Sequence, residues 1–257
     1  MGDGQWIAAL DSLPFSLVPE RALSAFGIDG VVGFCSGQPL PEGNVVGQAR
    51  LTGNNVDAAI TRVAERFGMN PYLWTVGPLS TPEDLPQHLR NRGLREGPSL
   101  VGMVFDQRDA VAEGSPWTVE RVSMEEELSH AATLASAYGM GMTPDSFEYV
   151  LRTVGESSPG SGIYLATDAT TRTVVGYGVT VALGPQLVFL SGSATVPAFR
   201  GRGVYRAVVA ARLRDAFAGG AEAALITAVS DTSAPICARM GFRACCTIQQ
   251  WYGNLTI

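Results

Sequence analysis

The chain contains no lysine, so all 18 of its basic residues are arginines. Against them stand 24 aspartates and glutamates, which gives a formal net charge of −6 at pH 7. This acidic balance argues against nucleic acid as a main partner, because neutralising the phosphates of a nucleic acid takes a basic surface. The absence of lysine itself more often reflects biased codon usage than a mechanism.

Histidine and cysteine are also scarce. The two histidines, His88 and His130, lie far apart in the sequence, and the four cysteines at positions 35, 237, 245 and 246 lack the spacing of a zinc site. We therefore expect no metal site, and we expect unpaired thiols in a reducing, cytoplasmic compartment.

Long apolar runs are missing as well. No stretch reaches membrane-spanning length, and Met1 to Leu10 contains an acidic residue and lacks the cationic start of a signal peptide. We expect no membrane partner. At 257 residues, 46% of them hydrophobic, the chain can hold one large domain or two small ones around a well-packed core.

The most informative segment runs from Thr195 to Arg206, with the sequence TVPAFRGRGVYR. A predicted strand, 186–196, leads into this loop, and a helix with apolar residues at helical spacing follows it. Gly201 and Gly203 allow the backbone to come close to a ligand. The first N–H groups of a helix have no intrahelical partner and its dipole makes that end positive, so the loop is predicted to bind an anion, above all a phosphate.

The loop alone has a simpler alternative, a strand-to-helix turn with its arginines in solvent. It is not a Walker A loop, because no Gly-Lys-Ser/Thr follows, and it lacks the third glycine and the later acidic residue of a dinucleotide fingerprint. The residues downstream favour a ligand site. They predict a strand over 223–229, a short helix over 234–240 that starts after the capping residues Asp231, Thr232 and Ser233 and ends at Gly241, and a strand over 243–252.

This order of elements, with the loop RGRGVY and the later Met-Gly-Phe at 240–242, resembles the GCN5-related N-acetyltransferase (GNAT) family. Arg200-x-x-Gly203-x-Tyr205 matches the family's pyrophosphate loop, [QR]-x-x-G-x-[GA], except at Tyr205, where a small residue is usual. Predicted helices over 125–138 and 144–153 and paired strands over 162–167 and 174–183 fit the same family. The resemblance covers about residues 116–257 and implies an α/β (α+β) fold with a mixed sheet.

The first half of the chain repeats this succession. Strands are predicted over 44–51, 72–76 and 99–105, and helices over 56–67 and from the cap at 80–84 to Arg92-Gly93-Leu94. We therefore expect two GNAT-like domains in tandem, residues 1–115 and 116–257, joined by a linker over 107–116. The first copy has Gly53-Asn54-Asn55-Val56 in place of RGRGV, so it is predicted to be degenerate and to bind no coenzyme. An unrelated α/β cap is the alternative.

The resemblance implies an acetyl-CoA-dependent N-acetyltransferase, in which an amine attacks the thioester directly and forms a tetrahedral intermediate. Backbone groups of Ala194, Thr195 and Val196 would pair with pantetheine, and one N–H would polarise the thioester carbonyl. The pyrophosphate would lie on the loop. The implied coenzyme contacts there are Arg200, Gly201, Arg202, Gly203, Val204, Tyr205 and Arg206, with Ser233 from the short helix.

The catalytic residues depart from the family pattern. The strand before the loop has no carboxylate, and Ser193 is one of its two polar positions, so deprotonation of the amine through ordered water is expected. Asp145, Glu148 and Asp231 are reserve bases, or else helix-start acids and caps. Cys237 stands where many members carry the tyrosine that protonates the leaving thiolate. It is either that acid or a small core residue, and Tyr205 is the rival donor.

The acceptor is expected to be a primary amine of a small molecule. The lysine-free composition and the diverged first half suggest an actinobacterial origin, where such enzymes often modify antibiotics or other specialised metabolites. A catalytically idle acyl-CoA-binding module with a sensing or scaffold role is the alternative from another class. Transfer of a longer acyl group and a mycothiol synthase are narrower alternatives, although the chain is short for the latter. The protein is expected to be a monomer or a homodimer.

Overall fold

The computed structural model describes residues 2–16, 28–36, 39–107, 115–138, 142–155 and 161–254. Its contacts divide the chain into two compact units. The first comprises Met1–Gly102, Ala228–Ala234 and Ala244–Ile257, and the second comprises Met103–Thr227 and Pro235–Arg243. The chain therefore passes from one unit to the other more than once, and each unit is described by itself.

The first unit contains a mixed sheet. Its strands follow the order β1 (Val32–Cys35), β2 (Asn44–Gly47), β3 (Tyr72–Val76) and β11 (Arg243–Gly253), and the short β4 (Arg95–Glu96) also pairs with β11. β2 and β3 are parallel, whereas β1 and β11 are antiparallel to their neighbours. The unit also contains α1 (Asp3–Ser16), a 3-10 turn (Pro41–Gly43), α2 (Val56–Phe67), α3 (Leu85–Asn91) and the start of β5 (Leu100–Phe105).

The core of the first unit forms where α2 and α3 bury their apolar stripes. Val56, Ile60 and Val63 recur at helical spacing on α2 and are almost completely buried. They pack with Trp74 of β3 and Trp251 of β11 in one cluster. Helix α2 therefore owes its position to this stripe, which was predicted over the same residues.

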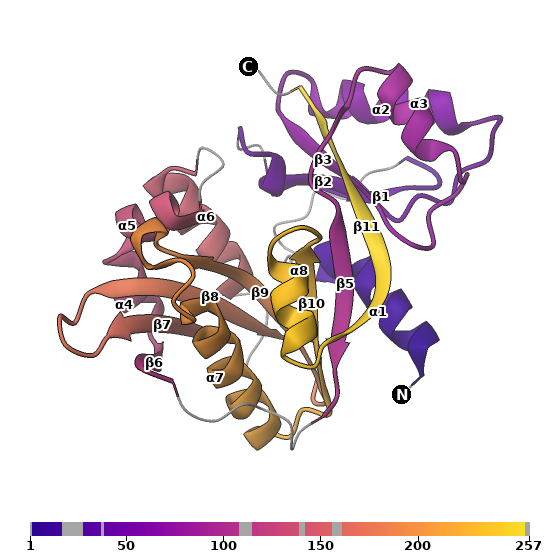
Figure 1. The fold of residues 1–257 in the computed structure, drawn as a ribbon. Coiled ribbons are helices and arrows are strands. Elements are labelled where there is room, and N and C mark those ends of the chain that lie inside the picture. Colours follow the sequence, from indigo (N-terminus) through magenta and orange to yellow (C-terminus); the bar gives the residue numbers. More distant parts are fainter. Residues whose placement is uncertain are drawn as a thin grey trace. The chain divides into compact units, whose positions relative to one another are not determined.

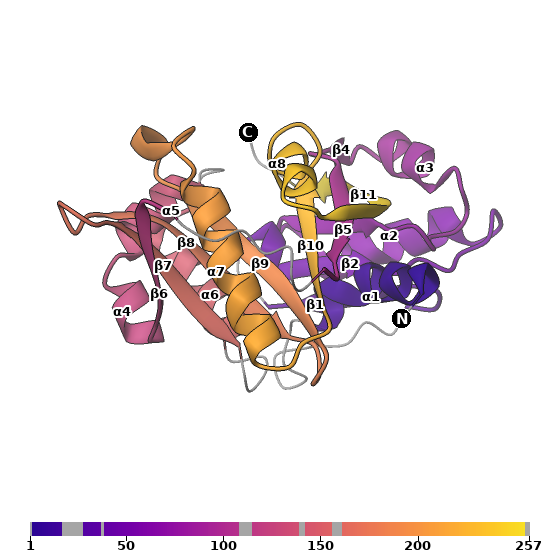
Figure 2. The same cartoon turned by 60° about the horizontal axis from the view of Figure 1, so that its bottom comes forward.

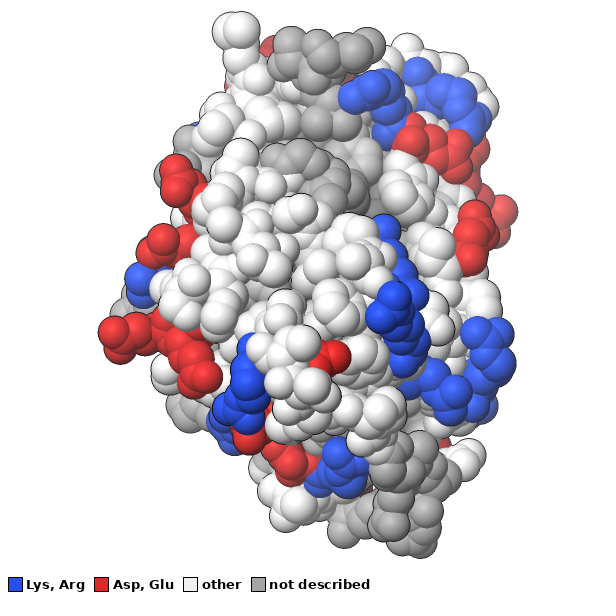
Figure 3. All heavy atoms as spheres, turned by 60° about the vertical axis from the view of Figure 1, so that its left-hand side comes forward, with Lys and Arg blue, Asp and Glu red and all other residues white. Residues whose placement is uncertain are grey.

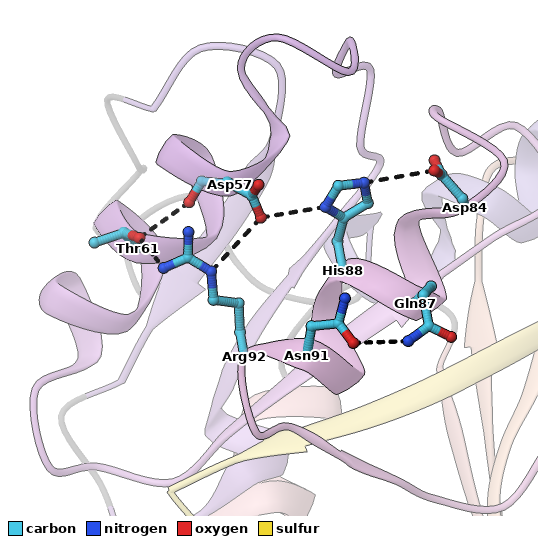
Figure 4. A network of polar contacts seen from close by, with 7 residues as sticks. All are labelled: Asp57, Thr61, Asp84, Gln87, His88, Asn91 and Arg92. Atoms are coloured by element: carbon cyan, nitrogen blue, oxygen red, sulfur yellow. Dashed lines mark hydrogen bonds and ion pairs between the residues drawn. The ribbon is translucent and has the colours of Figure 1, made fainter.

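A polar network joins the outer faces of α2 and α3 (Figure 4). His88 lies between two carboxylates, with its Nδ1 3.2 Å from Asp57 and its Nε2 3.5 Å from Asp84. Arg92 approaches Asp57 at 3.5 Å and donates to Thr61 Oγ1 at 3.0 Å. The network stabilises the contact between the two helices, because it pairs charges that α2 and α3 present to the same region.

The second unit is built on strands in the order β10 (Ala223–Val229, shared with the first unit), β9 (Leu187–Thr195), β8 (Val174–Ala182), β7 (Gly162–Asp168) and β6 (Trp117–Val122). Neighbours are antiparallel except β9 and β10, which are parallel. The helices of the unit are α4 (Met124–Leu128), α5 (Ala131–Tyr138), α6 (Pro144–Gly155), α7 (Val204–Ala218) and the end of α8 (Ser233–Arg239), with a 3-10 turn at Pro197–Phe199.

Helices cover both faces of this sheet, and Figures 1 and 2 show α7 along one face. A Cβ atom on Gly178 would meet Val208 and Arg212 of α7. The adjacent Tyr177 instead packs its ring edge-on against Phe147 of α6, with 5.2 Å between ring centroids. Successive residues of a strand point to opposite faces, so α6 and α7 cover opposite faces of the sheet.

The fold class predicted from the sequence is confirmed, since both units combine helices with mixed sheets. Most predicted elements begin and end within two residues of the observed ones. The helix predicted over 125–138 is two helices, α4 and α5, separated at Ser129 and His130. Helix α4 begins at Ser123, whose Oγ accepts a hydrogen bond from Glu126 N at 3.1 Å. Helix α1 and strands β1 and β6 were not predicted, and most of the proposed linker lies outside the described residues.

The two units share local features that the repeat hypothesis predicts. In each, a strand, a helix and a parallel strand follow one another, as β2–α2–β3 and as β9–α7–β10. The next helix ends the same way in both: Leu94 N donates to Leu89 O and Phe242 N to Cys237 O, each at 3.1 Å, across a glycine of positive φ. The compact units differ from residues 1–115 and 116–257, because β11 counts with the first. That division and the degeneracy of the first copy stay predictions.

Candidate functional site

Strand β9 leaves its neighbour β10 a third of the way along its length. The parallel pairs run only from Leu187 and Ala223 to Phe189 and Leu225. On the other side, β9 stays paired with β8 as far as Thr195, but the register shifts. Gly178 faces Ser193 and the next residue, Val179, faces Ser191, so Gly192 is one extra residue in β9. A bulge of this kind bends a strand and increases its twist.

The loop after β9 has the conformation that the glycines predict. Gly201 has φ +75° and Gly203 has φ +84°, values that residues with side chains rarely adopt. Apart from its chain neighbours, a Cβ atom added to either glycine would find no atom of the described residues within 4 Å. The backbone of the loop therefore faces open space at the start of α7.

The N–H groups of this loop point to an anion site. The first intrahelical bond of α7 runs from Ala207 N to Gly203 O, at 3.0 Å. Within the part of the chain that the structure describes, the backbone N–H groups of Gly201, Arg202, Gly203 and Val204 have no hydrogen-bond acceptor. Gly203 precedes the helix without a side-chain cap. The loop thus combines unpaired donors with the positive end of a 15-residue helix.

The arginines of the loop have different surroundings. Arg200 donates from Nε to Thr195 O at 3.2 Å and from Nη2 to Ala137 O at 3.1 Å, so its side chain fastens the loop to the strand and to α5. The Arg202 guanidinium lies 5.5 Å from the ring centre of Phe199, and the Arg202 carbonyl accepts from Trp117 Nε1 at 2.9 Å. Arg206 is exposed. Contacts of Arg202 and Arg206 with a ligand stay predictions.

The three residues expected to contact pantetheine differ in the hydrogen bonds that their groups already make. Val196 donates its N–H to Val175 O at 2.9 Å and accepts at its carbonyl from Phe199 N at 2.8 Å. The Thr195 hydroxyl is buried and has no hydrogen-bond partner among the described residues. Ala194 and Thr195 face Tyr177 and Gly176 of β8, so their opposite edge is the one that β10 has left. This edge is suited to pairing with an extended ligand, and the individual contacts stay predictions.

The structure brings the two candidate acids together. Tyr205 Oη lies 3.5 Å from Cys237 Sγ, so the two groups share a hydrogen bond. Cys237 is fully buried, and this burial raises the pKa of its thiol above the ordinary value. Tyr205 is only half-buried. The phenol is therefore the member of the pair that a ligand at the loop can reach.

Ser193 contacts a group that the sequence analysis missed. Its Oγ accepts from Nη1 of Arg212 at 2.5 Å, and Arg212 is fully buried on α7. Glu127 of α4 is also fully buried, and within the described part of the chain neither of its carboxyl oxygens has a hydrogen-bond partner. Burial raises the pKa of Glu127 to about 8, and the charge of Arg212 opposes this shift. A charged residue in the middle of an apolar helix stripe was the signal that could have revealed Arg212.

The remaining predicted residues lie in ordinary surroundings. Glu148 pairs with Arg152 at 2.8 Å, Asp145 is exposed at the start of α6, and Asp231 accepts from the Ser230 hydroxyl at 3.0 Å. Ser233 lies in the first unit, where its Oγ accepts from Val229 N at 2.8 Å. These contacts are those of caps and surface pairs, and a catalytic or coenzyme-binding role for these residues stays a prediction.

Three further observations concern ligands and partners. Among the described residues, no group of three or more His, Cys, Asp or Glu side chains is arranged to hold a metal ion. Within the same residues, no helix is long and apolar enough to cross a membrane. On the face drawn in Figure 3, most of the surface is uncharged, and the basic and acidic side chains lie in small separate groups.

Comparison with solved structures identifies the fold. A GCN5-related N-acetyltransferase from Kribbella flavida aligns with 98% of this chain and 96% of its own, at 18% identity and a TM-score of 0.72. A GCN5-related N-acetyltransferase from Sphaerobacter thermophilus aligns over 87% of this chain and 76% of its own, at 12% identity and a TM-score of 0.61. A tandem GNAT protein from the clavulanic acid biosynthesis pathway aligns over 98% and 94%, at 13% identity and a TM-score of 0.57.

At these identities the likeness to solved structures establishes the fold alone. No curated protein matches the sequence. One sequence model, that of the acetyltransferase (GNAT) family, matches residues 124–242, which is less than half of the chain. This range includes β9, the loop, α7 and Cys237. The part of the chain that these residues form is therefore similar to the acetyltransferase (GNAT) family.

Proposed function

We propose that this protein is an acetyl-CoA-dependent N-acetyltransferase that acts on a primary amine of a small molecule. The observation that carries the proposal is the row of unpaired N–H groups at Gly201, Arg202, Gly203 and Val204. These groups lie at the start of α7 with open space before them, and this is the arrangement that binds a pyrophosphate. The family match over the same residues supports coenzyme A as the source of that pyrophosphate.

The neighbouring strand is suited to the rest of the coenzyme. Beyond Phe189 and Leu225, β9 and β10 no longer pair, which leaves an edge of β9 for the pantetheine arm. Bound acetyl-CoA would supply the acyl group as a thioester. A backbone N–H on this edge, fixed before the ligand arrives, would stabilise negative charge on the thioester oxygen. Arg202 and Arg206 would add positive charge beside the phosphates.

Tyr205 is the proposed proton donor to the leaving thiolate. It extends from the first turn of α7, next to the loop, and its hydroxyl is hydrogen-bonded to Cys237. Cys237 itself is buried, and the raised pKa of its thiol makes it a poorer acid than an exposed cysteine. Because β9 carries no carboxylate, the incoming ammonium would lose its proton through ordered water.

Calorimetric titration with coenzyme A tests the binding step. The double variant Arg202→Ala/Arg206→Ala should weaken binding by roughly tenfold or more, because each arginine contributes a charge-assisted interaction with phosphate. Arg62→Ala is the matched control, since Arg62 is an exposed arginine on α2 of the first unit. If the wild-type protein does not bind coenzyme A, the proposal is wrong.

A thiol-reagent assay across a panel of small amines tests the chemistry. We expect amine-dependent release of thiol from acetyl-CoA and, with Tyr205→Phe, a loss of turnover of roughly 10²-fold or more at unchanged coenzyme affinity. Cys237→Ser should change turnover far less. Coenzyme binding without amine-dependent release would instead favour a catalytically idle acyl-CoA-binding module, an alternative that the missing carboxylate on β9 supports. Parallel assays with longer acyl-CoA donors identify the acyl group.

A further inference from the structure

The bulge in β9 lies directly over a buried arginine. Arg212 is fully buried, although it stands on α7 between apolar residues. Its Nη2 atom donates to the carbonyl of Val179 on β8 and, at 2.7 Å, to that of Ser191 on β9. These two residues face each other where the register shifts. One nitrogen therefore joins both strands at the bulge.

The other donors of Arg212 extend this link on either side. Nη1 donates to Ser193 Oγ at 2.5 Å, and Nε donates to Thr180 Oγ1 at 3.2 Å. Ser193 follows the extra residue Gly192, and Thr180 follows Val179. The guanidinium thus contacts each strand twice, at a backbone carbonyl and at a hydroxyl.

The guanidinium fits beside β8 because residue 178 is a glycine, and its neighbours limit its position. A Cβ atom on Gly178 would lie 2.8 Å from Nη1 of Arg212 and 2.9 Å from Ser193 Oγ, so the guanidinium occupies the place of a side chain at that position. Tyr177 approaches the bulge as well, because its ring and hydroxyl would lie 3.9 Å from a Cβ atom on Gly192. The bulge is therefore held between α7 and Tyr177.

Burying a guanidinium is costly, and hydrophobic residues of similar size often replace buried charges without loss of stability. Burial lowers the pKa of Arg212 to about 10, and Tyr205, Tyr164, Cys237 and Tyr177 act in the opposite direction. The charge of Arg212 in turn lowers the pKa of the buried Glu127, against the larger effect of burial. At neutral pH Arg212 remains a cation, so its charge is available to hold the two carbonyls.

We propose that Arg212 is a positioning residue that fixes the bulge of β9 and thereby the direction of the strand edge that receives the pantetheine arm. The proposal rests on the function proposed above. Arg212 does not contact the coenzyme, and Ser193 acts as its hydrogen-bond partner on β9 rather than as a catalytic group. Loss of the link lowers the fraction of molecules whose β9 edge can bind, and apparent affinity falls by that fraction.

Two ligands separate this role from that of the loop. Coenzyme A contacts both the loop and the β9 edge, whereas 3′-phospho-ADP has the pyrophosphate and no pantetheine. Arg212→Lys keeps the charge but cannot reach both strands at once. We expect it to weaken coenzyme A binding at least tenfold and to leave 3′-phospho-ADP binding within twofold of wild type. Ser193→Ala, which removes one of the four contacts, should show the same selectivity with a smaller loss.

Controls distinguish positioning from general destabilisation. Arg214→Lys makes the same chemical change at an exposed position of α7. Leu165→Ala removes a buried side chain of β7, which is separated from β9 by β8. Both should bind the two ligands like wild type, even though Leu165→Ala unfolds at lower temperature. Equal affinity of folded Arg212→Lys and wild type for coenzyme A would overturn the proposal, as would an equal loss for both ligands.

A measurement without ligand keeps this test separate from that of the proposed function. Hydrogen exchange of a peptide covering residues 187–196 should be at least tenfold faster in Arg212→Lys than in wild type, and unchanged in Arg214→Lys. If neither ligand binds wild type, the proposed function fails, and the exchange rate alone decides whether Arg212 holds the bulge. If Arg212→Lys does not fold, Ser193→Ala decides on the same readouts, and unchanged exchange in that variant would contradict the proposal.

Discussion

The buried carboxyl group of Glu127 makes the stability of the protein depend on pH. Glu127 has no solvent exposure, neither of its oxygens has a hydrogen-bond partner among the residues that the structure describes, and burial raises its pKa from 4.5 to about 8. In the unfolded chain the carboxyl group ionises near pH 4.5. Between these values the folded state keeps a proton that the unfolded state releases, so stability falls as the pH rises and stops falling above about pH 8.

The magnitude follows from the shift. Each pH unit between the two pKa values removes about 1.4 kcal/mol of stability, so the interval from pH 6 to pH 8 should cost about 2 kcal/mol. The lower limit of pH 6 keeps the protein above its isoelectric point of about 5.0. Glu127→Gln keeps the shape and removes the titrating group. The free energy of unfolding of this variant should not show this fall with pH. The stability of the variant relative to wild type should therefore increase as the pH rises.

Urea unfolding at pH 6, 7 and 8 measures the difference between wild type and variant at each pH. Glu125→Gln is the matched control, because Glu125 is an exposed residue on the same helix. It should shift stability by a similar amount at all three values. The reasoning is refuted if Glu127→Gln and wild type show the same dependence on pH, since Glu127 would then ionise alike in the folded and unfolded chain.

Three smaller predictions concern packing around the site and in the first unit. Gly178→Ala should destabilise the protein by about 1–3 kcal/mol in thermal unfolding, because its Cβ would lie 2.7 Å from Val208 Cγ1. Trp117→Phe removes the hydrogen bond from the indole N–H to the Arg202 carbonyl, which fixes the loop. It should weaken coenzyme A binding about threefold, measured by calorimetry. His88→Ala should lower stability by about 1 kcal/mol or less, because its network is exposed, and should leave coenzyme A affinity unchanged.

The helices and strands could be predicted where their apolar pattern is local. Val56–Phe67 and Val204–Ala218 carry stripes at helical spacing, and the glycines at 201 and 203 indicated the loop between strand and helix, where the structure has positive φ values. The same reasoning missed β6, which is an edge strand without buried alternation. It also predicted α4 and α5 as one helix, because neither Ser129 nor His130 is a glycine or a proline that would indicate the end of a helix.

The inner part of the site could not be predicted because it depends on strand register. Arg212 meets Ser191 and Ser193 across about twenty residues, and it does so only because Gly192 shifts the pairing of β8 and β9. A single sequence gives strand positions but not register. Ser193 was predicted as a catalytic group on account of its polarity. The structure shows that its hydroxyl accepts a hydrogen bond from Arg212 on α7, and the catalytic role stays a prediction.

Tyr205 and Cys237 show how two departures from the family pattern can depend on each other. Tyr205 stands where the family loop has a small residue, and Cys237 stands where many members have a tyrosine. In the structure the two side chains meet, with 3.5 Å between Oη and Sγ. We infer that the Tyr205 phenol occupies, from α7, the space that a tyrosine at position 237 of α8 would fill, and that the small Cys237 side chain leaves room for it.

This exchange can be reversed experimentally. Tyr205→Ala alone should lose at least about 10²-fold in turnover, as expected when a general acid is removed. Adding Cys237→Tyr places a phenol in the same space from α8. Turnover of this double variant should be at least about tenfold higher than that of Tyr205→Ala alone. Cys237→Phe in the same background fills the space without a hydroxyl and should restore nothing. If the tyrosine and phenylalanine double variants are equally inactive, the hydroxyl group at this place is not the proton donor, and the two departures are unrelated.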